Sequence, residues 1–206
     1  SLVYSSFDKT MLNNNKGLTS LGHYEIGAKF GSLMKILMDS LGKSWSPFFM
    51  RKAHENTVDA KNEITCRFIE LAFIYMVGGF FIICFSEEMI KLMTTKSFYP
   101  AMYVVPAYVY GYLFSIIGRL ASNQIMVAEK MHYLLPSNAV SIVLNIFLNI
   151  LLIPKYGAVG AAIATAIASL CSSFVLGYFG SRLYPIPTVR KRLLGMYALI
   201  MIFTVV

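Results

Sequence analysis

The stretch between Lys130 and Arg182 contains a single charged residue, Lys155, and this constrains the fold more than any other feature of the chain. Lys155 separates two apolar runs, residues 131–154 and 156–181. Each run is long enough to cross a bilayer as a helix, which takes about 20 apolar residues. Lys155 itself lies in a Pro-Lys-Tyr-Gly sequence, which is typical of a turn. The runs therefore predict two membrane helices joined by a short turn.

The overall composition excludes an ordinary soluble domain. Of the 206 residues, 57% are hydrophobic and 14% are charged, and the mean hydropathy is +0.62, whereas soluble domains carry about 25% charged residues. The net charge of +8 comes from Lys and Arg gathered near the ends of apolar runs, where they set topology and contact lipid headgroups. We therefore expect membrane lipids and no nucleic acid as partners. The three Cys residues lack the spacing of a disulfide framework or a metal site.

The distribution of apolar residues predicts an all-α fold, a polytopic bundle of transmembrane helices. The chain opens on the end of a helix, turns at residues 13–17, and stops inside an apolar run that starts at Leu193. We therefore expect residues 1–206 to be a piece of a longer protein, with a truncated span at each end. The loops near residues 51–67, 130 and 182–192 together hold more Lys and Arg than the opposite loops, which predicts that they are cytoplasmic. Complete spans are predicted near residues 21–47, 67–90, 100–127, 133–153 and 157–180.

A charged stripe on the predicted helix at 21–47 indicates a polar surface within the membrane. At about 100° per residue, the charged side chains share one side of the helix and the apolar side chains the other. A charge at the bilayer centre costs about 2.5–3.5 kcal/mol, so the stripe is expected to face a water-filled cavity or other protein. A helix lying on the membrane surface is the alternative. The stripe consists of Glu25, Lys29, Lys35, Asp39 and Lys43, in which opposite charges four residues apart can form pairs.

Arg119 is the one charged residue of the predicted span at 100–127. Tyr108 and Tyr112 share its helix face. An Arg beside tyrosines can hold a phosphate and stack on sugar rings, so these three side chains are candidates for substrate contact. The alternative is an Arg whose side chain extends to the headgroups at the cytoplasmic end of the span.

Polar and small residues mark the last two predicted spans. A stripe of Asn138, Ser141, Asn145 and Asn149 either makes hydrogen bonds between helices or lines a cavity, and the sequence leaves both open. Small residues on one face of the span at 157–180 indicate close helix packing.

The sequence carries little that enzyme chemistry requires. The three His residues lie far apart, and there is no Gly-rich phosphate loop, no Cys/His nucleophile pattern and no paired-carboxylate motif. We therefore predict a protein that is not an enzyme and that binds no cofactor and no metal. Since the sequence contains no nucleotide-binding domain, transport would be driven by an ion gradient or by the substrate gradient.

Two stretches resemble motifs of the O-antigen and polysaccharide flippases. The first is Phe-Asp-Lys-Thr-Met-Leu at residues 7–12, which leads through a turn to Gly22, Tyr24 and Lys29. The second is Ile-Pro-Lys-Tyr-Gly at residues 153–157, continued by small residues and preceded by the Asn-rich stripe. The order and spacing of the pieces agree along nearly the whole chain. The family belongs to the multidrug/oligosaccharidyl-lipid/polysaccharide exporter superfamily.

The resemblance implies one lobe of a two-lobe alternating-access transporter. Such flippases move an undecaprenyl-pyrophosphate-linked oligosaccharide, a repeat unit of O-antigen, capsule or another surface polysaccharide, across the bacterial cytoplasmic membrane. The lipid-linked oligosaccharide, a coupling ion (H⁺ or Na⁺) and the polysaccharide assembly machinery are the implied partners. Asp8, which lies in the motif, and Glu25 and Asp39, which are chosen by helical position, are candidates for ion coupling or charge balance. Lys29 also lies in the motif and is expected to line the cavity. The further expected cavity-lining residues are chosen by helical position and are Lys35, Lys43, Arg119, Tyr108, Tyr112 and Asn145.

Three alternatives to a flippase remain. A multidrug exporter of the same superfamily would take cations, and the excess of basic residues on the polar surface favours an anionic substrate instead. A membrane-embedded polysaccharide polymerase would need a long outer loop, and every predicted outer loop is short. A membrane scaffold would gain nothing from charges placed inside the bilayer.

Overall fold

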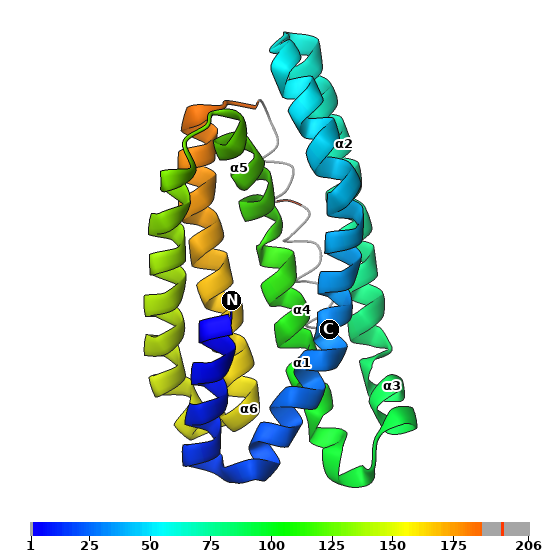
Figure 1. Cartoon of the computed structure of the whole chain (residues 1–206). Coiled ribbons are helices and arrows are strands. Elements are labelled where there is room, and N and C mark those ends of the chain that lie inside the picture. The colour runs from blue at the N-terminus through cyan, green and yellow to red at the C-terminus, as the bar shows by residue number, and fades with distance from the viewer. Residues whose placement is uncertain (1, 187–194, 196–206) are drawn as a thin grey trace.

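The computed structural model describes residues 2–186 and residue 195. The predicted span that begins at Leu193 lies outside the described residues, apart from Gly195. The regular structure of the described part is helical throughout, and Figure 1 shows the long helices running side by side in an elongated bundle. The predicted all-α fold is confirmed. In chain order the elements are α1 (Leu2–Glu55), α2 (Val58–Cys84), α3 (Ser86–Met93), η1 (Lys96–Tyr103), α4 (Val104–Phe114), α5 (Ile116–Val127), η2 (Met131–Tyr133) and α6 (Leu134–Leu183).

Three segments of the described chain are long and apolar enough to cross a membrane: Val58–Cys84, Lys96–Val127 and Met131–Leu183. They carry large apolar side chains on their outer surfaces, including Phe81 and Phe147, which are more than half exposed. Such side chains suit contact with lipid. α1 is not among the three segments, because its stripe of charged residues lowers its hydropathy.

Two glycines turn long helices into hairpins. In α1, Gly17 has φ 76° and ψ 177°, and in α6, Gly157 has φ 55° and ψ −129°. The hydroxyl of Tyr24 reaches back to Asp8, and the amide of Asn145 reaches forward to the hydroxyl of Thr165. The residues on either side of each glycine therefore run in opposite directions. The predicted turns at residues 13–17 and 154–157 are confined to these single glycines, because their other residues stay helical.

The backbone at Gly17 makes a substitution there costly. Its φ and ψ fall in a region that is essentially restricted to glycine, and a side chain held there costs about 1–3 kcal/mol. A Cβ at this position would meet no other atom within 4 Å, so the cost is one of conformation alone. We expect Gly17→Ala to lower the free energy of unfolding by about that amount. Unfolding in mixed detergent micelles measures it, and an unchanged stability would contradict the hairpin.

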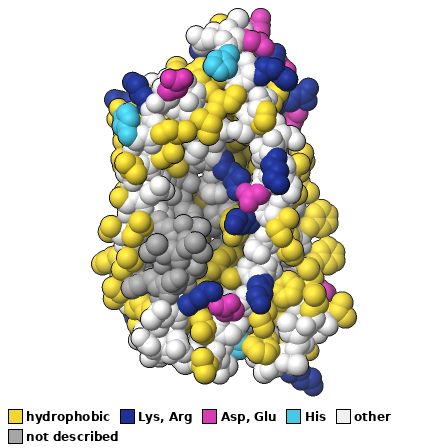
Figure 2. Space-filling model, in the orientation of Figure 1, with side chains coloured by type: hydrophobic (Ala, Val, Ile, Leu, Met, Phe, Trp, Pro, Cys, Tyr) yellow, Lys and Arg dark blue, Asp and Glu magenta, His cyan; other side chains and the backbone are white. Residues whose placement is uncertain are grey.

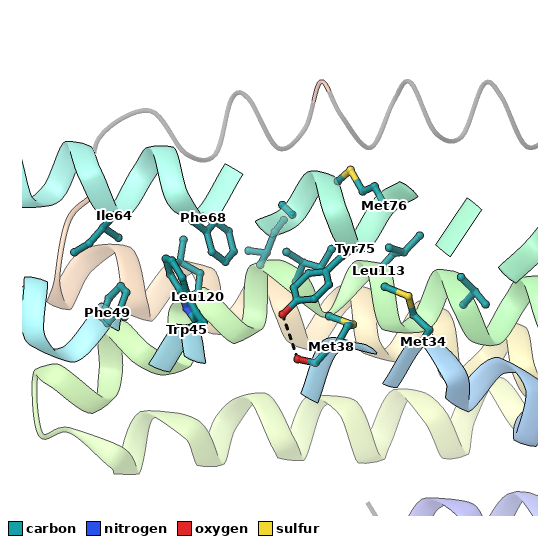
Figure 3. Close-up of a cluster of buried hydrophobic side chains, with 14 of the residues drawn as sticks. Met34, Met38, Trp45, Phe49, Ile64, Phe68, Tyr75, Met76, Leu113 and Leu120 are labelled. Atoms are coloured by element: carbon teal, nitrogen blue, oxygen red, sulfur yellow. Dashed lines mark hydrogen bonds between the residues drawn. The ribbon is translucent and has the colours of Figure 1, made fainter. Parts of the chain in front are cut away.

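The main hydrophobic core lies where α1, α2, α4 and α5 meet. Trp45 of α1 packs against Phe68 of α2 with ring centroids 5.3 Å apart, and against Phe49 at 5.8 Å. Farther along the same interface, the Tyr75 hydroxyl donates to the carbonyl of Met38 at 3.2 Å. Figure 3 shows these side chains between the helices, with the Tyr75 bond as a dashed line. The core fixes the second half of α1, residues 18–55, against α2 and α5, and so positions the charged stripe.

Candidate functional site

A buried polar network joins the two hairpins. Asp8 is 2% exposed, and it accepts hydrogen bonds from the Tyr24 hydroxyl at 2.8 Å and from the Asn149 amide. The Thr165 hydroxyl lies 3.4 Å from the same carboxylate. The Asn149 amide also donates to the side-chain oxygen of Asn145 at 3.1 Å. The network thus joins both halves of α1 to both halves of α6.

Apolar side chains enclose this network. Leu12, Val104 and Ile153 are fully buried around it. A carboxylate in such surroundings is stable only when hydrogen bonds or a cation compensate the loss of water. The side-chain oxygen of Asn149 is also buried and has no hydrogen-bond partner among the described residues. Within the same part of the chain, no group of three or more His, Cys, Asp or Glu gathers as a metal cluster would.

A first cavity, of about 650 Å³, lies between α1, α4, α5 and both halves of α6. Asp8 at one side connects it to the buried network. Lys35 and Arg119 bring positive charge to its wall, and Tyr108 and Tyr112 bring aromatic rings. Small apolar residues such as Ala107 and Ala166 share the remainder of the wall with hydroxyl and amide groups. These are contributed by Ser115, Ser122, Ser141, Asn145, Thr165, Ser169, Ser172 and Ser173.

A second cavity, of about 520 Å³, lies between α1, α2 and α5. Arg119 lines both cavities, whereas Asp39 and Lys43 line only the second. The Arg119 guanidinium donates to the Asp39 carboxylate at 2.7 Å, and the two side chains are 35% and 46% exposed. Gly42 faces this pair, since a Cβ there would lie 3.5 Å from a guanidinium nitrogen. The ion pair therefore stands between the two cavities.

The charged residues of the α1 stripe form other ion pairs than those predicted from the sequence. Figure 2 shows Lys, Arg, Asp and Glu side chains along this face of the molecule. Among the described residues, Glu25 pairs with Lys9 at 2.7 Å instead of with Lys29, and Asp39 pairs with Arg119 instead of with a lysine of its own helix. The expected pairs within the helix were wrong, because packing brings partners from other helical segments closer. Lys29 is exposed, and neither it nor Glu25 lines either cavity.

The structure therefore brings together most of the residues singled out from the sequence. Asp8, Lys35, Tyr108, Tyr112, Arg119 and Asn145 surround the first cavity, and Asp39 and Lys43 surround the second.

Sequence reasoning gave no site role to Thr165, named Tyr24 only as part of a motif, and left open whether the stripe that holds Asn149 bonds helices together or lines a cavity. All three lie in the stretches that carry the family resemblance, and the spacing of Asn145 and Asn149 by four residues was an available signal. It also missed Trp45 of the second cavity, and it noted Asn123 only as a neighbour of Arg119. No sequence signal could have identified Trp45, because its place depends on how α1 packs against α2 and α5.

Comparison with known proteins gives one similarity. No known family profile matches the chain, and no solved structure does. The chain is similar to the probable low-salt glycan biosynthesis flippase Agl15 of the archaeon Haloferax volcanii, with 21% identity over 166 residues. The alignment covers 80% of this chain and 35% of that protein, so the chain spans about a third of its relative's length. The likeness thus extends over most of a chain whose helices can cross a membrane.

Proposed function

We propose that the chain forms one lobe of a membrane flippase that moves a lipid-linked glycan from one leaflet to the other. The observation that carries the proposal is the first cavity, which combines two basic side chains with aromatic rings and many hydroxyl groups inside a membrane-spanning bundle. The distant likeness to a probable glycan biosynthesis flippase supports it.

The chemistry of the first cavity suits a glycan attached to a phosphate. Lys35 and Arg119 attract an anionic group, and a guanidinium can bind phosphate oxygens in pairs. Serine and asparagine side chains exchange hydrogen bonds with sugar hydroxyls, and Tyr108 and Tyr112 offer ring faces to sugars. A cation exporter would place acidic or apolar side chains in these positions. The cavity therefore favours an anionic, hydroxyl-rich substrate over a cationic drug.

The finer features of the proposal rest on the resemblance of the two motif stretches. They are an undecaprenyl-pyrophosphate carrier, a second lobe that completes the transport path, a bacterial cytoplasmic membrane and contact with polysaccharide assembly proteins. Coupling to H⁺ or Na⁺ at Asp8 belongs with them, because its carboxylate lies buried beside the first cavity. The similar protein is archaeal, so the choice between a bacterial and an archaeal carrier lipid belongs to the experiment.

The proposal predicts that removing the cavity cations stops glycan export. In cells that lack the full-length gene, we expect surface glycan to disappear while completed lipid-linked glycan accumulates on the cytoplasmic face. We expect rescue by the wild-type gene, and at least tenfold less surface glycan with Lys35→Ala or Arg119→Ala, since a charge-assisted hydrogen bond contributes about 1.5–3 kcal/mol. Surface glycan and membrane-bound intermediates are quantified together.

Arg67→Ala is the matched control for this experiment. It also removes a positive charge, but from an exposed side chain of α2 that pairs with Glu70 at 2.9 Å. We expect full rescue by this variant. Unchanged surface glycan in the deletion strain, together with new sensitivity to cationic dyes, would replace the flippase proposal with a multidrug exporter.

A further inference from the structure

The second cavity differs from the first in the character of its wall. Aromatic and aliphatic side chains, including Phe68, Leu71 and Ile116, form one part of it. Lys43 and Arg119 bring positive charge to the same space. Hydrocarbon and cationic groups so close together fit an amphiphile whose anionic group adjoins an apolar chain. A free sugar would find few hydroxyl partners against the apolar part.

Trp45 provides a second sign that this space is built for a ligand. The side chain is 8% exposed and lines the second cavity. Figure 3 shows it packed among apolar side chains, close to Phe68. Its indole N–H is buried and has no hydrogen-bond partner in the described part of the chain. Buried Trp side chains usually find an acceptor, and a buried donor without one costs about 1–3 kcal/mol.

The ion pair between Arg119 and Asp39 bears on how an anion could bind here. Arg119 lines both cavities, and its 2.7 Å bond to Asp39 occupies the guanidinium on the side of the second cavity. Lys43 is exposed, and no ion pair occupies it among the described residues. A phosphate that enters beside Lys43 can take the place of the carboxylate on the guanidinium, because both are oxygen acceptors of similar geometry.

We propose that the second cavity is a separate subsite for the junction between a phosphate group and a hydrocarbon chain, and that the phosphate replaces the Asp39 carboxylate on Arg119. The inference rests on the proposed function, since a lipid-linked glycan carries such a junction next to its sugars. The hydrocarbon lies against the Phe68 side of the cavity. Arg119, which borders both cavities, then holds the phosphate at the boundary between the sugars in the first cavity and the chain in the second.

Trp45 allows this subsite to be observed directly, because it is the single Trp of the chain. The difference in tryptophan emission between the full-length protein and its Trp45→Phe variant isolates the signal of this residue. The probes are farnesyl diphosphate, inorganic pyrophosphate, farnesol and phosphatidylglycerol. We expect farnesyl diphosphate to change the Trp45 emission saturably, and pyrophosphate and farnesol to need at least tenfold higher concentrations. An equal response to phosphatidylglycerol assigns the subsite to a bilayer lipid with the same junction chemistry, and a weaker response assigns it to a prenyl carrier.

Substitutions at the ion pair test the replacement step. We expect Arg119→Gln to weaken farnesyl diphosphate binding at least tenfold, and Asp39→Asn to leave it unchanged or tighten it, because the competing carboxylate is gone. If the Arg119–Asp39 ion pair only stabilised the fold, both variants would weaken binding equally. That result would overturn the proposal that phosphate replaces the Asp39 carboxylate. Lys43→Gln alters no ion pair of the described residues and is expected to weaken binding several-fold, which shows that a cation of this cavity matters even where the ion pair is intact.

Two further results would overturn the subsite. One is the absence of any saturable change in Trp45 emission, and the other is an equal response to inorganic pyrophosphate alone. Glycan export in the same variants separates this inference from the proposed function. If export depends on Arg119 but no probe changes the Trp45 emission, the flippase proposal is supported and the subsite is refuted. A responding Trp45 in a protein whose deletion leaves surface glycan unchanged supports the subsite and refutes the flippase.

Discussion

Replacing Asp8 with Ala is expected to lower the free energy of unfolding by about 2–6 kcal/mol, because two buried donors lose their acceptor at about 1–3 kcal/mol each. These donors are the Tyr24 hydroxyl and the Asn149 amide, which both bond to the Asp8 carboxylate. The same change removes the hydrogen bonds that link the two hairpins beside the first cavity, so glycan export should fail as well. Unfolding of the purified full-length protein in mixed micelles measures the stability, and surface glycan in complemented cells measures the export.

Glu25→Ala is the matched control, since it also removes a carboxylate from α1, at a residue next to Tyr24. Its ion pair with Lys9 is partly exposed, with side-chain exposures of 37% and 43%, and such pairs contribute about 0–1 kcal/mol. We expect it to leave stability nearly unchanged. Equal destabilisation by both variants would mean that the buried network does not hold the hairpins together.

Asp8→Asn separates the structural role of this residue from a role in ion coupling. The amide oxygen can still accept one of the hydrogen bonds, so we expect a smaller loss of stability than with Ala. A proton or sodium ion, however, requires the charge of the carboxylate. Export that fails in a stable Asp8→Asn protein supports ion coupling, whereas export that continues places Asp8 in the structure alone.

The helical architecture could be predicted from the sequence because the membrane demands long apolar runs. The runs on either side of Lys155 correspond to the two halves of α6, with the reversal at Gly157. The helix boundaries were harder to predict from the sequence. α2 begins at Val58, nine residues before the predicted span at 67–90, because the Thr57 hydroxyl accepts from the Ala60 N–H at 3.1 Å and caps the helix. Hydropathy counts only the apolar part of a helix, and the first turns of α2 are polar.

The candidate site was predictable only in part, for a related reason. The residue types needed to build a polar cavity were visible along α1 and α5, because charged residues in an apolar chain are conspicuous. The contacts between them were not. An ion pair between neighbours on one helix contributes about 0.2–0.5 kcal/mol, which is too little to decide the geometry against packing. Asp39 therefore bonds to Arg119, 80 residues away in sequence, and Asp8 bonds to Asn149, 141 residues away.

Two glycines of α1, Gly27 and Gly31, allow α1 and α4 to pack closely. A Cβ on Gly27 would lie 2.5 Å from the Cβ of Val104, and a Cβ on Gly31 would lie 2.5 Å from the Cβ of Tyr108. Real Cβ atoms do not approach so closely, so alanines at both positions must push the helices apart. Overpacking costs about 1–3 kcal/mol at each site, so we expect the double variant Gly27→Ala/Gly31→Ala to lose about 2–6 kcal/mol of unfolding free energy. Unfolding in mixed micelles measures this loss.

The loss should reach the site as well as the fold. Tyr108 lines the first cavity, so a shift of α4 away from α1 moves an aromatic wall of the proposed glycan site, and export should fall together with stability. Gly42→Ala is the control on the same helix. The nearest atom to a Cβ there is the flexible end of Arg119 at 3.5 Å. Ala stabilises a helix interior by about 1 kcal/mol relative to Gly, so this variant should not be destabilised. If the double variant were as stable as Gly42→Ala, α1 and α4 would not be in glycine-mediated contact, and the first cavity would need a different wall.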